Sequence, residues 1–199
     1  MLALQLSAEQ LQRLQQLLDE LVKWNQAYNL TSITAPAQML THHLLDSLAV
    51  HADVVGTRVA DVGTGAGFPG LPLAIVQSER EFTLIDSNNK KIRFVTHAAR
   101  ALGLKNVRPV HARAESYRDA AGFDTVVARA CAPLPELLRW ARPLCRPGTR
   151  VLAMKGKRSA EAWTGVSADW QVQAVRKIDV PGLDAERHVI VLTRGTLPA

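Results

Sequence analysis

The chain has 199 residues, a length that fits one domain with a small extension, and 47% of its residues are hydrophobic, enough for a sizeable core. No run of about 18 uncharged apolar residues is present, which argues against a membrane span. Residues 1–4 lead into a polar helix and not into a secretory signal, so we expect a cytoplasmic protein. Cys131 and Cys145 form no paired framework, and we expect no metal.

The formal net charge is +6 and the isoelectric point is about 9.7. A small basic cytoplasmic protein often binds a polyanion, so the charge favours a nucleic-acid partner over ordinary solubility charge. The basic residues are spread along the chain, and the preference is therefore modest.

Two helices are predicted at the N-terminus. Ser7 and Gln10 form a capping box, and leucines follow at helical spacing up to Trp24 or beyond. The apolar face of this first helix is predicted to contain Leu11, Leu14, Leu18, Leu21 and Val22. Trp24 and Tyr28 share one helix face, and we interpret them as packing residues in preference to base-stacking residues.

Pro36 suits the first turn of a second helix, whose apolar face is predicted to contain Met39, Leu40, His43, Leu44 and Leu48. Asp46 and Ser47 could support the following loop from behind. We interpret residues 1–55 as a helical extension packed on a core formed by residues 56–199.

A glycine-rich loop follows a short apolar strand at 59–62 that contains one acid, Asp61, and precedes a helix at 71–76. Its glycines are Gly63, Gly65, Gly67 and Gly70. A strand, a glycine turn and a helix bring the backbone close to a nucleotide-like ligand. Taken from Gly65 the pattern is the dinucleotide fingerprint, and taken from Asp61 it is the loop of methyltransferases that use S-adenosylmethionine.

The rest of the chain alternates strands and helices. Strands are predicted at 81–86, 107–110, 123–128 and 150–154, and helices at 90–102 and 134–144. Two further strands, 170–180 and 188–193, are joined without a helix, which predicts an antiparallel hairpin at the sheet edge. The sum is an α/β fold: a doubly wound, mostly parallel, seven-stranded sheet with an N-terminal helical extension.

Several side chains follow the strand ends, where such sheets bind ligands. Asp86 could accept the ribose hydroxyls of an adenosine; alternatively, Asp86 or Ser87 could cap the next helix. Glu115 could accept the adenine amino group, or it could be a solvated charge. Arg129 could pair with a cofactor carboxylate or an RNA phosphate, with a surface ion pair as the alternative.

Three basic residues, Lys155, Lys157 and Arg158, follow the fifth strand and are either phosphate contacts or a solvated charge run. Cys131 could be a nucleophile for cytosine methylation, but we favour a structural thiol.

Taken together, these motifs resemble the bacterial small-subunit ribosomal RNA guanine-N7 methyltransferases, also called the glucose-inhibited division protein B family. The resemblance runs from Trp24 to about Leu192 and rests on residues 24–31, 43–47, 61–70, 84–87, 129–130, 155–156 and 186–188. It implies a class I methyltransferase that uses S-adenosylmethionine to methylate guanine N7 in 16S ribosomal RNA, either free or within a small-subunit particle.

The resemblance also implies which residues contact the cofactor: Gly63, Phe68, Ala114, Glu115 and Arg129. To these the loop pattern adds Gly65 and Asp86, and the matching motif at 186–188 adds Arg187 to the expected RNA contacts. His42 departs from the family, in which an arginine is common at this position. Cys131 stands where the family requires no cysteine.

Guanine N7 carries a free lone pair at neutral pH, so attack on a methyl group needs no general base, and the sequence contains no clear acid–base pair. The expected role of Arg129 is orientation. Two other functions stay open at this point: an NAD(P)-dependent oxidoreductase that uses the glycine fingerprint, and a non-catalytic RNA-binding module. We expect a monomer.

Overall fold

The computed structural model describes residues 4–129, 132–156 and 166–195. Its seven strands form one sheet in the order β3-β2-β1-β4-β5-β7-β6. The strands are β1 (Arg58–Val62), β2 (Glu81–Asp86), β3 (Val107–His111), β4 (Phe123–Arg129), β5 (Cys145–Lys155), β6 (Trp170–Ile178) and β7 (Arg187–Arg194). Strands β1 to β5 are parallel, whereas β7 runs antiparallel to both β5 and β6. The predicted doubly wound sheet with an antiparallel hairpin at its edge is confirmed.

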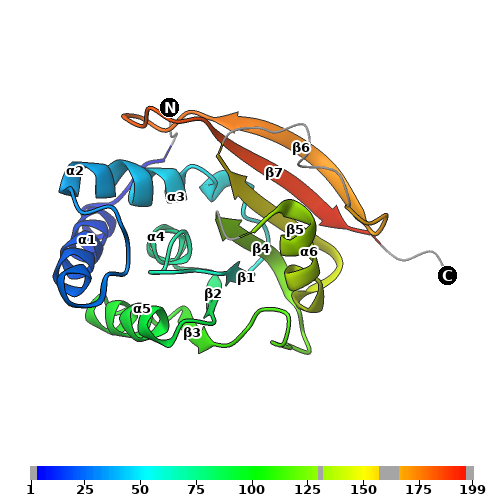
Figure 1. The fold of residues 1–199 in the computed structure, drawn as a ribbon, viewed down its shortest axis with the longest axis horizontal. Coiled ribbons are helices and arrows are strands. Elements are labelled where there is room, and N and C mark those ends of the chain that lie inside the picture. Colours follow the sequence, from blue (N-terminus) through cyan, green and yellow to red (C-terminus); the bar gives the residue numbers. More distant parts are fainter. Residues whose placement is uncertain (1–3, 130–131, 157–165, 196–199) are drawn as a thin grey trace.

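Helices cover both faces of this sheet (Figure 1). They are α1 (Ala8–Tyr28), α2 (Pro36–Met39), α3 (Asp46–Leu48), α4 (Gly70–Val76), α5 (Asn89–Ala101) and α6 (Leu134–Ala141). Alternate residues of the central strands β1, β4 and β5 enter different cores. Val59 packs in the cluster that contains residues of α1, α4 and α5, whereas Ala60 packs in the cluster that contains residues of α6. Burial on both faces explains why the parallel strands read as continuous apolar runs.

The first helix begins as predicted, with the capping box between Ser7 and Gln10. Its buried stripe differs in one place from the prediction. Leu11 is 55% exposed, whereas Leu17, which was not predicted, is fully buried. The reason is that the centre of the stripe runs through Leu14, Leu17 and Leu21, and Leu11 lies on its flank.

Helix α1 packs against α4 and α5, and its aromatic residues take part in this contact. The Trp24 ring lies 5.7 Å from the ring of Phe94 and 4.9 Å from that of His97 on α5, measured between ring centres. Tyr28 stacks on Trp24 at 5.1 Å and stays 37% exposed. The N-terminal segment and the sheet thus share one core, while the domain boundary at residue 55 stays a prediction.

The second predicted helix contains a wide turn. Between α2 and α3 the chain forms a π-helical turn over Leu40–Leu45. Such a turn inserts extra backbone into the helix and rotates the following side chains relative to regular α spacing. Leu40, at the start of this turn, is 45% exposed, against the prediction, whereas His43, Asp46 and Ser47 are buried.

Candidate functional site

A cavity of about 760 Å³ opens at the carboxyl ends of strands β1 to β5. The sheet order places the switch point between β1 and β4, because the chain runs outward from β1 to β3 and then returns to the other side of β1. Nearly all predicted site residues that the structure describes line this cavity. They are Gly63, Gly65, Asp86, Ala114, Glu115, Arg129, Lys155 and Arg187.

The glycines of the loop after β1 serve different purposes. A Cβ on Gly65 would meet only the Lys91 Nζ atom, at 3.8 Å, so a ligand can approach the backbone here. A Cβ on Gly67 would lie 2.3 Å from Leu71, and one on Gly70 would lie 2.7 Å from an oxygen of Asp61. Gly67 and Gly70 are therefore required for packing of the loop and α4, and Gly65 is the position that leaves room for a ligand.

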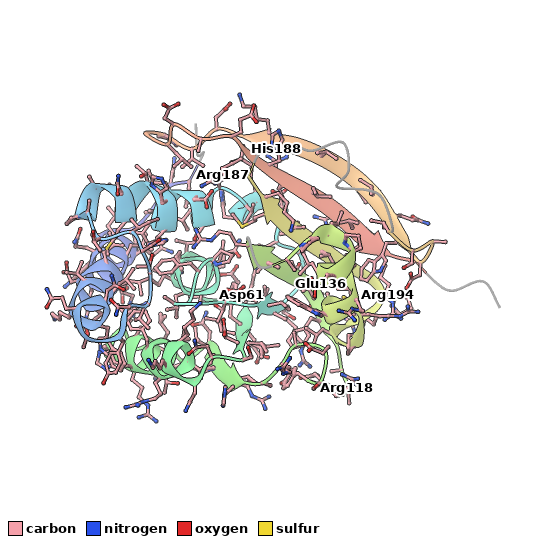
Figure 2. The ribbon with its side chains drawn as sticks, in the orientation of Figure 1. Asp61, Arg118, Glu136, Arg187, His188 and Arg194 are labelled. Atoms are coloured by element: carbon pink, nitrogen blue, oxygen red, sulfur yellow. The ribbon has the colours of Figure 1, made fainter. Side chains whose placement is uncertain are left out.

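Asp61 lies beneath the loop and does not line the cavity (Figure 2). Its Oδ2 atom accepts hydrogen bonds from the Thr64 hydroxyl at 2.6 Å and from the Gly70 N–H at 2.8 Å. Its Oδ1 atom has no hydrogen-bond partner among the described residues. Burial raises the pKa of Asp61 to about 6, although both hydrogen bonds favour the charged form. The carboxyl group thus fixes the loop from behind, the role expected of Asp46 and Ser47.

Asp86 closes the other side of the loop. Its Oδ2 atom accepts a hydrogen bond from the Gly65 N–H at 2.8 Å, and its Oδ1 atom accepts one from the Asn88 N–H at 2.8 Å. Asn88 is the residue that caps α5, so the alternative assignment of the cap to Asp86 or Ser87 was wrong. Asp86 is left at the cavity wall with its carboxylate oriented by backbone N–H groups.

The next strand end contributes Ala114 and Glu115. Ala114 is buried, while the Glu115 side chain is 41% exposed and lies 3.7 Å from the guanidinium of Arg113. This half of the cavity therefore combines bare backbone at Gly65 with carboxylates at two strand ends. Its size is in the range of small-molecule sites, about 300–1,000 Å³. The open backbone and the two acids fit a nucleoside-containing cofactor such as S-adenosylmethionine.

Arg129 stands on the opposite side of the cavity, at the end of β4. Its Nη1 group donates to the His42 carbonyl at 2.7 Å and to Asp46 Oδ2 at 3.0 Å. Burial lowers the pKa of the guanidinium, and the nearby Asp46 carboxylate opposes this effect. The ion pair is not a surface pair as the alternative supposed, since the two side chains are only 17% and 3% exposed.

Phe68 lies behind the cavity wall. It is 4% exposed, is absent from the lining, and stacks on the His43 ring with 4.9 Å between ring centres. The Arg129 guanidinium also lies over the Phe68 ring, 5.7 Å from the ring centre. The Phe68 side chain therefore supports Arg129 and His43, and its assignment as a cofactor contact stays a prediction.

His43 lines the same cavity as Arg129. Burial, followed by the charge of Arg129, lowers the pKa of His43 to about 4. Its Nε2 atom lies 3.1 Å from the Thr31 hydroxyl. The ring is thus neutral at physiological pH.

Sequence reasoning missed the role of Asp46. Its Oδ1 atom accepts a hydrogen bond from Arg187 Nε at 3.1 Å, while its Oδ2 atom accepts the bond from Arg129. Figure 2 shows Arg187 where β7 begins, next to the helical segment that carries Asp46. The sequence pointed to Asp46 only as a possible support for the loop and as part of the matching motif at residues 43–47.

Lys155 lines the cavity and donates a hydrogen bond from its Nζ atom to the Ala132 carbonyl. Lys157, Arg158 and Cys131 lie outside the described residues. Side chains that line the cavity without having been predicted include those of Thr31, Lys91 and Trp140. Among the described ranges no group of three or more His, Cys, Asp or Glu residues could hold a metal ion. In the same ranges, no helix combines the length and the apolar character needed to cross a membrane.

Solved structures with similar folds include S-adenosylmethionine-dependent methyltransferases. A structure titled as a SAM-dependent methyltransferase from Aquifex aeolicus superposes with a TM-score of 0.61 at 20% identity, covering 78% of this chain and 93% of the other. TrmN from Thermus thermophilus superposes with a TM-score of 0.60 at 24% identity, covering 86% of this chain and 52% of the other. At these identities the comparison establishes the fold alone.

Sequence relatives are much closer. Ribosomal RNA small subunit methyltransferase G of Methylococcus capsulatus is 51% identical over 184 residues, which are 92% of this chain and 89% of the relative. The protein of the same name from Shewanella amazonensis is 44% identical over 191 residues, 96% and 93% of the two chains. The family described as rRNA small subunit methyltransferase G matches residues 10–190. The chain therefore belongs to the rRNA small subunit methyltransferase G family.

Proposed function

We propose that this protein transfers the methyl group of S-adenosylmethionine to N7 of a guanine in 16S ribosomal RNA. As a member of its family it is an S-adenosylmethionine-dependent rRNA methyltransferase. The observation that carries the assignment of the site is the division of one cavity into two halves. The half at β1 to β3 has open backbone at Gly65 and the carboxylates of Asp86 and Glu115, with Lys91 and Arg113 beside them. The half at β4, β5 and β7 has Arg129, Lys155 and Arg187, with Asp46 between the two arginines.

The first half is the proposed cofactor site. The backbone of Gly63 and Gly65 would approach the ligand, and the carboxylates of Asp86 and Glu115 would accept hydrogen bonds from its hydroxyl and amino groups. Ala114 would form the wall beside Glu115. When bound, S-adenosylmethionine supplies a methyl group attached to a positively charged sulfur.

The second half is the proposed place of the guanine and its phosphates. Arg129 is fixed by the His42 carbonyl, by Asp46 and by the Phe68 ring, so its orientation is set before a ligand arrives. Preorganised groups of this kind align the reacting atoms, and alignment is the main requirement of an in-line displacement. The N7 lone pair is free, so no side chain has to remove a proton, and neutral His43, engaged with Thr31, is not needed as a base.

The decisive experiment is transfer of labelled methyl groups to 16S ribosomal RNA that lacks the modification, followed by mapping of the product base. The RNA is supplied both free and within a small-subunit particle. We expect label on guanine N7 in one or both substrates. Label on cytosine would contradict the proposal, and cofactor binding without any transfer would support the non-catalytic RNA-binding module.

The nicotinamide alternative has a separate test. Calorimetry with S-adenosylhomocysteine and with NAD compares the two cofactor classes on the same protein. We expect binding of S-adenosylhomocysteine alone, because the curated relatives and the family are methyltransferases. Action as a monomer, and in the cytoplasm, stays a prediction.

A further inference from the structure

Asp46 stands between two arginines that come from distant parts of the chain. One carboxylate oxygen binds Arg129 at 3.0 Å and the other binds Arg187 at 3.1 Å. The Asp46 side chain is 3% exposed, and those of Arg129 and Arg187 are 17% and 23% exposed. A buried carboxylate with a guanidinium on each oxygen cannot easily rotate, so it fixes the positions of both arginines.

The positive charges of Arg129 and Arg187 are not fully balanced by Asp46. Two guanidinium groups share one carboxylate, which leaves one positive charge at the wall of the cavity. That excess suits an anionic group of a ligand, and RNA offers a phosphate at every nucleotide.

The hydrogen bonds of Arg187 orient its guanidinium for contact with a phosphate. It donates to Asp46 through Nε and to the Glu186 carbonyl through Nη1, while its Nη2 group has no hydrogen-bond acceptor among the described residues. Because the Nε bond fixes the plane of the guanidinium, the direction of Nη2 is fixed as well. Arg187 also lines the cavity beside Lys155 and Gly156, at the carboxyl end of β5.

We propose that Asp46 is a positioning residue that holds Arg187 for contact with a phosphate of the RNA next to the target guanine. The proposal rests on the proposed function, since it assumes an RNA substrate in the second half of the cavity. Asp46 itself touches neither RNA nor cofactor. It acts by fixing the orientation of the Arg187 guanidinium.

The test measures RNA affinity against salt concentration for wild type, Arg187→Gln, Asp46→Asn and the double variant. Loss of one phosphate contact should lower the slope of log affinity against log salt by about 0.7 to 0.9. We expect this decrease for Arg187→Gln, nearly the same decrease for Asp46→Asn, and no further decrease in the double variant.

Asp46→Asn separates positioning from simple electrostatics, because the two predict opposite signs. Removing a carboxylate beside a polyanion should by itself strengthen RNA binding. Weaker binding with a smaller slope therefore supports positioning. Stronger binding or an unchanged slope overturns it.

Asp53→Asn is the matched control. Asp53 lies in the same N-terminal segment and pairs with Arg176, but it does not line the cavity. The same change in charge is thus made away from the site, and we expect a slope no smaller than that of wild type. A decrease equal to that of Asp46→Asn would overturn the proposal.

Arg187→Lys serves if Asp46→Asn does not fold. A single ammonium group cannot bind Asp46 and also reach the place of Nη2, so positioning predicts a loss similar to that of Arg187→Gln. A wild-type slope for Arg187→Lys overturns the proposal. Calorimetry with S-adenosylhomocysteine separates a failure of this proposal from a failure of the proposed function. If folded wild type does not bind S-adenosylhomocysteine, the proposed function is contradicted, whatever the salt dependence of RNA affinity is.

Discussion

Asp61 should make the folded protein less stable as pH rises through the acid range. The carboxyl group is fully buried, and burial raises its pKa from the ordinary value of 3.8 to about 6. Below pH 3.8 the folded and unfolded chains both hold the proton, and above about pH 6 both have lost it. Between these values only the folded chain is protonated, so raising the pH favours unfolding.

The size of the effect follows from the two pKa values of Asp61. They differ by about two pH units, and one unit corresponds to about 1.4 kcal/mol, so ionisation of the buried carboxyl group costs about 3 kcal/mol of stability. Asp61→Asn removes the titration and keeps an oxygen for the bonds from Thr64 and Gly70. The stability of wild type minus that of the variant should therefore fall by about 3 kcal/mol between roughly pH 3 and pH 7.

The assay is urea unfolding of wild type and Asp61→Asn at constant ionic strength over this range. Asp124→Asn provides a control of opposite sign. Partial burial opposes ionisation of Asp124, but the N–H groups of Arg58 and Thr57 and the Arg146 guanidinium outweigh it and lower its pKa. The stability of wild type minus that of Asp124→Asn should therefore rise with pH. A difference for Asp61 that is constant, or that rises with pH, would refute the reasoning.

Three further predictions concern the site. Gly65→Val should lose most S-adenosylmethionine affinity, and because Gly65 has a positive φ, the valine should also lower the free energy of unfolding by about 1–3 kcal/mol through backbone strain. Gly70→Ala should lower the free energy of unfolding by about 1–3 kcal/mol, because its Cβ would press against Asp61 and Leu84, but it should keep more of the cofactor affinity. Calorimetry on the folded variants is the measurement, and a loss of affinity for Gly70→Ala as large as that for Gly65→Val would contradict the division of roles. Cys131→Ser should keep substantial methyl transfer, and loss of activity with intact cofactor binding would indicate a covalent mechanism instead. Single-turnover transfer at saturation should be nearly independent of pH between about 7 and 9, where a required base would give a titrating limb. Arg129→Lys should be slower without gaining a pH dependence, and a rate that rises tenfold per pH unit in wild type would demand a proton acceptor.

The sequence by itself determined the order of strands and helices, the class of sheet, and the glycine-rich loop after β1. These features depend on local properties: the period of apolar residues, the capping box at Ser7, and the glycines between β1 and α4. The family resemblance rested on the same short motifs, and the family match confirmed it. Local patterns were also sufficient to place Asp86 and Arg129 at strand ends, and hence near one cavity.

The contact partners of those side chains depend on tertiary structure alone. The segment with the π-helical turn over Leu40–Leu45 leaves Leu40 exposed and Asp46 buried, and no local preference of the sequence predicted this wide turn. The partners of Asp46 stand 83 and 141 residues further along the chain, on β4 and β7. Such a cluster depends on which strands become neighbours in the sheet, and its residues carry no periodic signal that links them. The different roles of Gly65 and Gly70 were hidden for the same reason, because the space in front of a glycine is filled or left open by atoms from other elements.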